Sequence, residues 1–232
     1  MRVVSLVPSA TETLLAWGIE PIACTRFCEQ PSIAAVGGTK DPDVPSIVAL
    51  APDLVVMDEE ENRREDHAAL LENGIAVHAL AVRGLDDVDA QLAALAARVG
   101  AVWHGVDPRS HAPTRVTDPR PAFVPIWRRP WMALGVPTYG SSLLHTLGYS
   151  NVFASASYPT ITLDEARDAQ PAVVIAPSEP YPFAERHRAE LEEVAPVVFV
   201  DGKDLFWWGV RTSGAIDRLR AALAEGDRRG LG

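Results

Sequence analysis

The stretch LAPDLVVMDE at residues 50–59 is the strongest indication of the fold, because it has a counterpart in AQPAVVIAPSE at residues 169–179. In both stretches a proline precedes an apolar run and an acidic residue follows it. An amphipathic helix and a further apolar strand come next in each half of the chain. A continuous apolar run of this length is typical of a strand that is covered on both faces in a parallel sheet. The repeat therefore predicts two α/β units of similar design.

The rest of the chain alternates strand and helix around these two stretches. The apolar runs predict strands at residues 3–7, 22–25, 54–58, 75–80, 122–127, 172–176 and 197–201. Helical spacing predicts helices at residues 10–17, 45–50, 63–73, 86–104, 141–147, 163–168, 183–194 and 213–224. The fold class is α/β, with two Rossmann-like lobes joined by one backbone helix. The predicted domains are an N-terminal lobe at 1–85, the bridging helix at 86–104, a Pro-rich linker at 105–121 and a C-terminal lobe at 122–232.

Composition and charge exclude several classes of protein. The formal net charge is −10 and no basic stripe is present, so nucleic acid is not an expected partner. Two cysteines cannot build a disulfide framework, and no apolar run approaches the length of a membrane span. The first predicted strand follows Met1 and Arg2 directly, which leaves no room for a signal peptide. The sequence as it stands predicts a cytoplasmic protein, or an extracytoplasmic one if a leader has been removed.

Ligands of parallel sheets bind beyond the carboxyl ends of the strands, where polar residues collect in this chain. Ser9 opens the first helix, whose free N–H groups favour an anion or a polar ligand edge; alternatively, Ser9 only caps that helix. The acidic run at 58–61 makes Glu59 and Glu60 candidates for contact with a ligand or cation. Alternatively, these acids only complement a helix dipole. Glu179 holds the corresponding place in the second half.

Cys28 and Glu29 form the one weak metal candidate, because a thiolate and a carboxylate can bind a soft or borderline cation. Cys24 lies at the end of a predicted strand and is expected in the core. The six histidines are scattered, and no nucleophile elbow, phosphate-binding loop or dinucleotide fingerprint is present. We therefore expect a binding protein without catalytic residues and without a required cofactor.

Two tryptophan-rich stretches are predicted to form the ligand platform of the second lobe. Aromatic rings exposed in loops mark binding sites, flat rings suit a flat ligand, and guanidinium groups suit its carboxylates or phosphates. A lid that packs on itself or a core plug is the alternative. The candidates are Trp127, Arg128, Arg129, Trp131, Tyr139, Tyr181, Phe206, Trp207, Trp208 and Arg211.

Four further stretches carry a resemblance to a known family: VVSLVPSATETL at 3–14, VGG at 36–38, IVALAPDLV at 47–55 and GYSNVF at 148–153. Together they resemble the substrate-binding proteins of vitamin B12, haem and iron-siderophore importers, and most of all the cobalamin-binding branch and its small relatives described as helical-backbone metal receptors. The resemblance spans nearly the whole chain. It implies two α/β lobes bridged by one long rigid helix, with the ligand in the cleft between them.

The resemblance also implies a function and partners. The ligand would be a corrinoid, haem-like or siderophore-like metal chelate, such as cobalamin or an iron chelate. The partner would be an ABC permease, docked through surface acids such as Glu65 or Asp66 in one lobe and Glu185 in the other. The alternative is a cytoplasmic metallochaperone or chelatase-like enzyme built on the same architecture.

Overall fold

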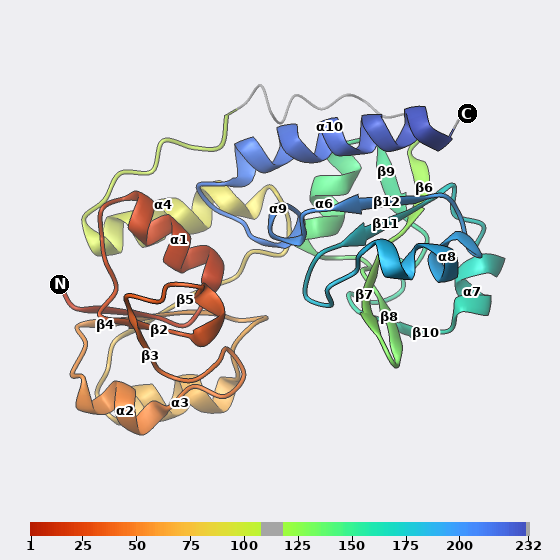
Figure 1. Ribbon diagram of the computed structural model, residues 1–232. Coiled ribbons are helices and arrows are strands. Elements are labelled where there is room, and N and C mark those ends of the chain that lie inside the picture. The colour runs from red at the N-terminus through yellow and green to blue at the C-terminus, as the bar shows by residue number, and fades with distance from the viewer. Residues whose placement is uncertain (108–117, 231–232) are drawn as a thin grey trace. The chain divides into compact units, whose positions relative to one another are not determined.

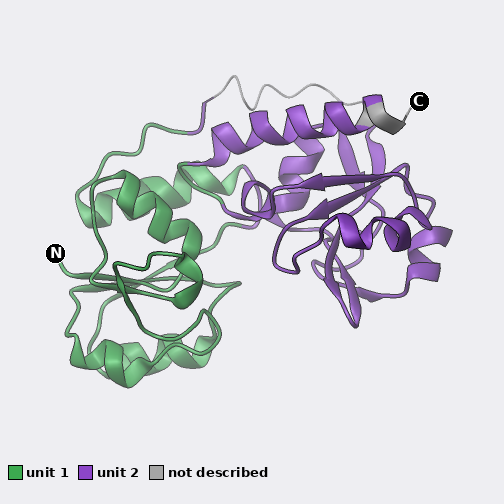
Figure 2. Ribbon diagram, in the orientation of Figure 1, with its two compact units in different colours: residues 1–82, 86–105, 208–210 green, residues 83–85, 106–207, 211–232 purple. Residues whose placement is uncertain are grey.

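The computed structural model describes residues 1–107 and 118–230 and divides the chain into two compact units (Figure 2). Unit 1 comprises Met1–Val82, Asp86–Gly105 and Trp208–Val210, and unit 2 comprises Arg83–Leu85, Val106–Trp207 and Arg211–Gly232. Most of the predicted linker at 105–121 lies outside the described residues. No helix in the described part of the chain is both long and apolar enough to span a bilayer.

Unit 1 is a parallel sheet with helices on both faces, as the repeat predicts. Its strand order is β3-β2-β1-β4-β5, and every pairing is parallel. The strands are β1 (Val3–Ser5), β2 (Ala23–Cys24), β3 (Ala34–Ala35), β4 (Leu54–Asp58) and β5 (Val77–Leu80). The helices are α1 (Pro8–Ala16), η1 (Arg26–Cys28), α2 (Val44–Ala49), α3 (Arg64–Glu72) and α4 (Asp87–Val99). Helices α1 and α4 cover one face of the sheet, and α2 and α3 cover the other (Figure 1).

Unit 2 contains a parallel sheet and a small antiparallel one. The parallel sheet has the order β12-β11-β6-β9 and the antiparallel sheet the order β10-β8-β7. The strands are β6 (Arg120–Phe123), β7 (Pro125–Arg128), β8 (Trp131–Ala133), β9 (Tyr149–Asn151), β10 (Thr160–Ile161), β11 (Val173–Pro177) and β12 (Val197–Val200). The helices are α6 (Tyr139–Thr146), α7 (Leu163–Asp168), η2 (Glu185–His187), α8 (Arg188–Glu192), α9 (Gly202–Phe206) and α10 (Thr212–Gly230). Helix α10 lies along one face of the parallel sheet and α8 lies on the other (Figure 1).

The two strands of the sequence repeat are the buried centres of their sheets. Strand β4 pairs with β1 and β5, β11 pairs with β6 and β12, and every residue of both strands is buried. Burial on both faces explains why their sequences are continuously apolar rather than alternating. The core of unit 1 gathers around Val55 and Met57, and that of unit 2 around Phe123 and Val174.

Several element boundaries differ from those predicted. The predicted strand at 122–127 is two strands, β6 and β7, which belong to different sheets. The predicted helix at 86–104 ends at Val99, because Gly100 takes the left-handed conformation (φ 75°) that stops a helix. The predicted helix at 183–194 is reduced to η2 and α8. Helix α4 is part of unit 1, and its role as a rigid bridge stays a prediction.

Candidate functional site

Each parallel sheet has one point where the direction of strand addition reverses. In unit 1 this switch point lies between β1 and β4, because the chain builds outward to β2 and β3 before it returns to β4. In unit 2 it lies between β6 and β11. Ligands of open α/β sheets bind outside the carboxyl ends of the strands at such points. The candidate site residues are therefore those that follow β1 and β4 in unit 1 and β6 and β11 in unit 2.

Ser9 lies in the first turn of α1, immediately after β1, and is completely buried. The N-cap of this helix is Val7, which makes no side-chain capping bond, so the alternative reading of Ser9 as the cap is wrong. Pro8 at the first helical position explains the start of the helix, since proline has no N–H to satisfy there. The Ser9 Oγ has no hydrogen-bond partner among the described residues. Its contact with a ligand stays a prediction.

Asp58 closes the turn that follows β4. Its Oδ1 accepts hydrogen bonds from the backbone N–H groups of Glu60 (2.8 Å) and Glu61 (3.1 Å). Burial raises the pKa of the Asp58 carboxyl to about 6, and these backbone bonds offset the effect only in part. The side chains of Glu59 and Glu60 are exposed at this edge. The acidic run thus divides into one buried structural acid and surface acids, whose contact with a ligand remains a prediction.

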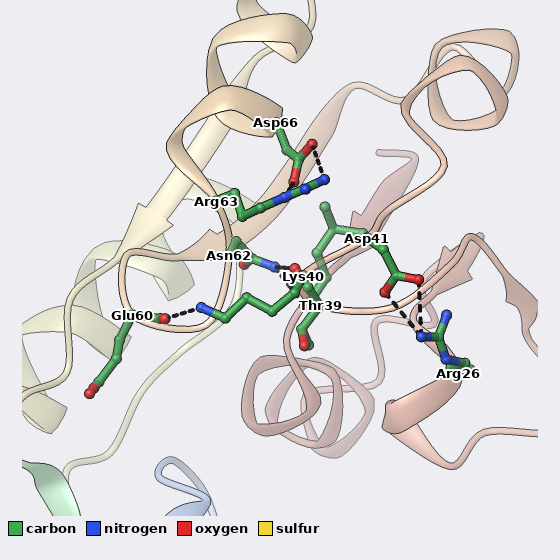
Figure 3. Close-up of polar contacts among 9 residues, drawn as sticks. Arg26, Thr39, Lys40, Asp41, Glu60, Asn62, Arg63 and Asp66 are labelled. Atoms are coloured by element: carbon green, nitrogen blue, oxygen red, sulfur yellow. Dashed lines mark hydrogen bonds and ion pairs between the residues drawn. The ribbon is translucent and has the colours of Figure 1, made fainter. Parts of the chain in front are cut away.

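Asn62 and Lys40 are polar residues of this edge that sequence reasoning missed (Figure 3). The buried Asn62 side chain donates from Nδ2 to the carbonyl oxygens of Leu6 (3.2 Å) and Thr39 (2.9 Å). Lys40 Nζ donates to the carbonyl oxygen of Glu60 (2.6 Å). The available signal was the position of Asn62, which follows a buried strand and lies four residues after Asp58.

The proposed metal pair divides between the core and the surface. Cys28 is 2% exposed, and its Sγ lies 3.1 Å from Thr11 Oγ1 and 3.2 Å from Thr25 Oγ1, whereas Glu29 is exposed. Cys24 is also buried, as expected, and burial raises the pKa of its thiol to about 12. The neighbouring Cys28 adds to that shift. The described residues hold no group of three or more His, Cys, Asp or Glu side chains arranged to bind a metal.

The first tryptophan stretch of unit 2 is a β-hairpin rather than a loop. Trp127 lies in β7 and Trp131 in β8, and the two strands pair antiparallel around the exposed Arg129. Trp127 is 44% exposed. Trp131 instead stacks on Phe183 (centroids 5.9 Å apart, planes at 10°) against the core cluster. The hairpin thus presents Trp127 rather than both indoles.

Tyr181 lies in the segment that follows β11 and contacts Trp127 of β7, which follows β6. Its ring meets Trp127 edge to face, with centroids 5.7 Å apart, and it also contacts Phe183 at 4.7 Å. Arg128 is held by an ion pair with Glu190 (2.9 Å). Glu179 follows β11 and is half-buried. The segments that follow β6 and β11 therefore carry an aromatic edge, made of Trp127 and Tyr181, with Arg128 anchored beside it.

The second tryptophan stretch does not form one platform. Trp208 is only 3% exposed, so the prediction that both indoles lie on an exposed platform is wrong. Trp207 and the preceding Phe206 are half-buried. Lys203 Nζ lies 5.0 Å, and Arg211 Cζ 5.2 Å, from the centroid of the Trp207 ring. These cation–π contacts already occupy part of the indole that was predicted to receive a planar ligand.

Tyr139 and Arg211 are structural in unit 2. Tyr139 is 4% exposed, its Oη lies 3.1 Å from Thr212 Oγ1, and burial raises the pKa of its phenol. The expected exposure of Tyr139 on the platform is therefore wrong. Arg211 pairs with the buried Asp204 (2.9 Å), which also pairs with Arg218 (2.6 Å). A buried carboxylate that forms ion pairs with two guanidinium groups is a structural network.

The surface acids suggested for permease docking differ in accessibility. Asp66 is only 7% exposed and pairs with Arg63 (2.9 Å), whereas Glu65 is exposed. Glu185 is exposed and pairs with Arg188. Of the two acids named in unit 1, Glu65 is the one that a partner can reach.

The α/β fold of this chain is shared with solved periplasmic binding proteins. Among solved structures, the periplasmic vitamin B12-binding protein BtuF of Vibrio cholerae matches with a TM-score of 0.77 at 20% identity, and the match covers 97% of both chains. The periplasmic haem-binding protein BhuT, solved in complex with two haems, matches with a TM-score of 0.80 at 19% identity. That match covers 97% of this chain and 98% of BhuT. The predicted α/β fold class, with parallel sheets flanked by helices, is confirmed.

The sequence itself is similar to a vitamin B12-binding protein of Pectobacterium carotovorum subsp. carotovorum (strain PC1). The two are 24% identical over 230 residues, which cover 88% of this chain and 81% of the relative. No model of a known protein family matches the chain.

Proposed function

We propose that this protein is a non-catalytic binding protein for a metal chelate, which it captures for an ABC importer. The observation that carries the proposal is the likeness over most of the chain to vitamin B12-binding proteins in sequence and fold, and to haem-binding proteins in fold. The predicted ligand classes remain corrinoid, haem-like and siderophore-like chelates. The alternative of a metallochaperone or chelatase-like enzyme has no support among these comparisons.

The carboxyl edges of the two sheets support this function physically. In unit 2, the exposed Trp127 and the neighbouring Tyr181 offer apolar ring surface to a flat macrocycle. In unit 1, the exposed Glu59, Glu60 and Lys40 offer polar contacts to groups on a ligand's periphery. A few polar groups beside aromatic surface are the usual composition of a small-molecule site.

The location and the partner belong to the same proposal. The solved relatives BtuF and BhuT are described as periplasmic. A protein that delivers a chelate to an importer works outside the cytoplasm, so we propose an extracytoplasmic location. Exposed Glu65 and Glu185 are the acids through which the permease would be met.

A fluorescence titration tests the ligand. Cyanocobalamin, haemin and a ferric siderophore would each be added to the purified protein while tryptophan emission is followed. We expect saturable quenching by at least one chelate. Covering one indole face buries on the order of 100 Å², worth about 2.5 kcal/mol. Replacing Trp127 by Ala should therefore weaken binding about 30- to 100-fold.

The matched control for this substitution is Trp17→Ala. Trp17 is also in an edge-to-face aromatic pair, with Trp103 (6.3 Å), but it lies at the end of α1 that is far from Ser9. Its removal should leave the affinity unchanged. Saturation by none of the three chelates would refute the proposal.

A further inference from the structure

One buried side chain joins three segments at the switch point of unit 1. Asn62 is 6% exposed and follows β4. Its Nδ2 donates to Leu6 O at the end of β1 and to Thr39 O in the segment 37–43, and its Oδ1 accepts from Asp58 N (2.8 Å). In Figure 3 the amide of Asn62 points at the Thr39 carbonyl, and Lys40 reaches across to Glu60.

The other side-chain contacts that hold the segment 37–43 are exposed. Lys40 Nζ donates to Glu60 O, and the ion pair of Arg26 with Asp41 joins side chains that are 51% and 62% exposed. Exposed ion pairs contribute little to stability, whereas a buried polar group that loses its partner is costly. Backbone bonds hold the two ends of the segment, from Arg26 N to Gly37 O (2.9 Å) and from Asp43 N to Val36 O (3.0 Å). Between these ends, the Asn62–Thr39 bond is the one side-chain contact among the described residues that a buried side chain makes, so the position of the middle of the segment depends on it.

The turn after β4 does not need this bond. It is closed by the two hydrogen bonds to Asp58 Oδ1 and by the backbone bond from Asn62 N to Asp58 O (3.0 Å). Removing the Nδ2 donor should therefore free the segment 37–43 and leave the turn in place. If Asn62 served only the turn, its removal would disturb the turn and leave the segment 37–43 in place.

We infer that Asn62 is a positioning residue for ligand binding in unit 1. It fixes the segment 37–43 beside the turn 58–62, so that both meet the ligand as one surface. This inference rests on the proposed function, because only a ligand at the switch point of the sheet would contact both segments. Lys40, exposed in the fixed segment and hydrogen-bonded to the Glu60 backbone, is the side chain that Asn62 places toward the ligand.

Two measurements on Asn62→Ala test the inference. Amide hydrogen exchange should accelerate about tenfold or more in residues 37–43 while β1 and β4 stay protected, and affinity for cyanocobalamin should fall about tenfold. In the Asn62→Ala background, Lys40→Met should weaken binding less than it does in the wild type, because a freed segment no longer places Lys40. Asn62→Asp keeps the size and the Oδ1 acceptor but sets a carboxylate oxygen against the carbonyls of Leu6 and Thr39, so it also releases the segment and is the second variant if Asn62→Ala does not fold.

Asn73→Ala is the matched control. The Asn73 Nδ2 also donates to a backbone carbonyl, that of Ala69 (2.8 Å), but at the exposed end of α3. It should change neither exchange in residues 37–43 nor affinity. Unchanged exchange in that segment would overturn the inference, and so would a freed segment with unchanged affinity. If the wild type binds neither cyanocobalamin nor haemin, the proposed function fails, and the exchange result alone decides whether Asn62 positions the segment.

Discussion

At the scale of single residues, the carboxyl edge of unit 1 keeps polar atoms buried without partners. Asp58 is 4% exposed, and its Oδ2 has no hydrogen-bond partner among the described residues. Burial removes water from the carboxylate and disfavours its ionised form, which is the main cause of the raised pKa. At neutral pH the ionised Asp58 therefore lowers the stability of the protein, although its Oδ1 accepts the hydrogen bonds that close the turn.

Asp58→Asn should stabilise the protein at pH 7.5 and not at pH 3.5. With a folded pKa near 6 against 3.8 unfolded, the folded state binds the proton more tightly, so stability is lost as pH rises from about 4 to 6. Removing the charge should recover about 3 kcal/mol. The unpartnered amide that replaces it costs about 1–2 kcal/mol. Urea denaturation at both pH values measures the difference, and a wild type more stable than the variant at pH 7.5 would contradict the assignment.

Substitution by alanine should distinguish the buried Trp208 from the exposed Trp127 by the loss in the free energy of unfolding. Trp208→Ala should lower the free energy of unfolding by about 3–5 kcal/mol, because Trp208 is 3% exposed and its removal leaves a cavity. Trp127→Ala should cost under about 1.5 kcal/mol, because its ring is 44% exposed and the loss is mainly one aromatic contact. Thermal and urea unfolding of both variants measure this, and equal losses would show that the burial is misassigned.

At the scale of elements, the sequence predicted well where burial alone decides the structure. Strands β4 and β11 are continuous apolar runs, and their pairing at the centres of two sheets confirms the repeat. The sequence did not predict the break between β6 and β7. Residues 122–127 form one apolar run, and hydrophobicity does not indicate which sheet each part of the run joins. The exposure of each tryptophan side chain depends on tertiary packing. Neighbouring indoles at 207 and 208 entered different units, which no local pattern encodes.

The short segment Trp208–Val210 packs closely against Thr13 of α1. Gly209 has φ 116°, a conformation that favours glycine, and a Cβ there would overlap the Thr13 hydroxyl. Val210 N also donates to Thr13 Oγ1 (3.4 Å). The segment is thus fitted against α1 of unit 1 although it follows α9 of unit 2 in sequence.

Gly209→Ala should lower the free energy of unfolding by about 3 kcal/mol or more, through backbone strain combined with the overlap. Gly74→Ala is the control, because Gly74 also has positive φ (75°) but a Cβ there meets nothing within 4 Å. It should cost only about 1 kcal/mol. Chemical denaturation compares the two, and equal effects would mean that Thr13 does not restrict this position.

At the scale of the whole molecule, the chain carries two similar units, and the residues that follow the switch point differ in kind between them. Acidic and amide side chains gather in unit 1, and aromatic rings with an anchored arginine gather in unit 2. The sequence predicted these edges because parallel strands gather their carboxyl ends at one side of a sheet. It did not predict which side chains stay accessible, since Tyr139, Cys28 and Trp208 are buried by packing from distant segments.

Equilibrium dialysis against cyanocobalamin and haemin is the direct test of whether this protein binds a metal chelate. Each chelate would be quantified by its own visible absorbance on both sides of the membrane, with the wild type, Trp127→Ala and Trp17→Ala in parallel. We predict about one equivalent of at least one chelate retained by the wild type and by Trp17→Ala, with retention reduced for Trp127→Ala. Equal chelate concentrations in the protein and buffer chambers for the wild type, at protein concentrations well above micromolar, would contradict the account.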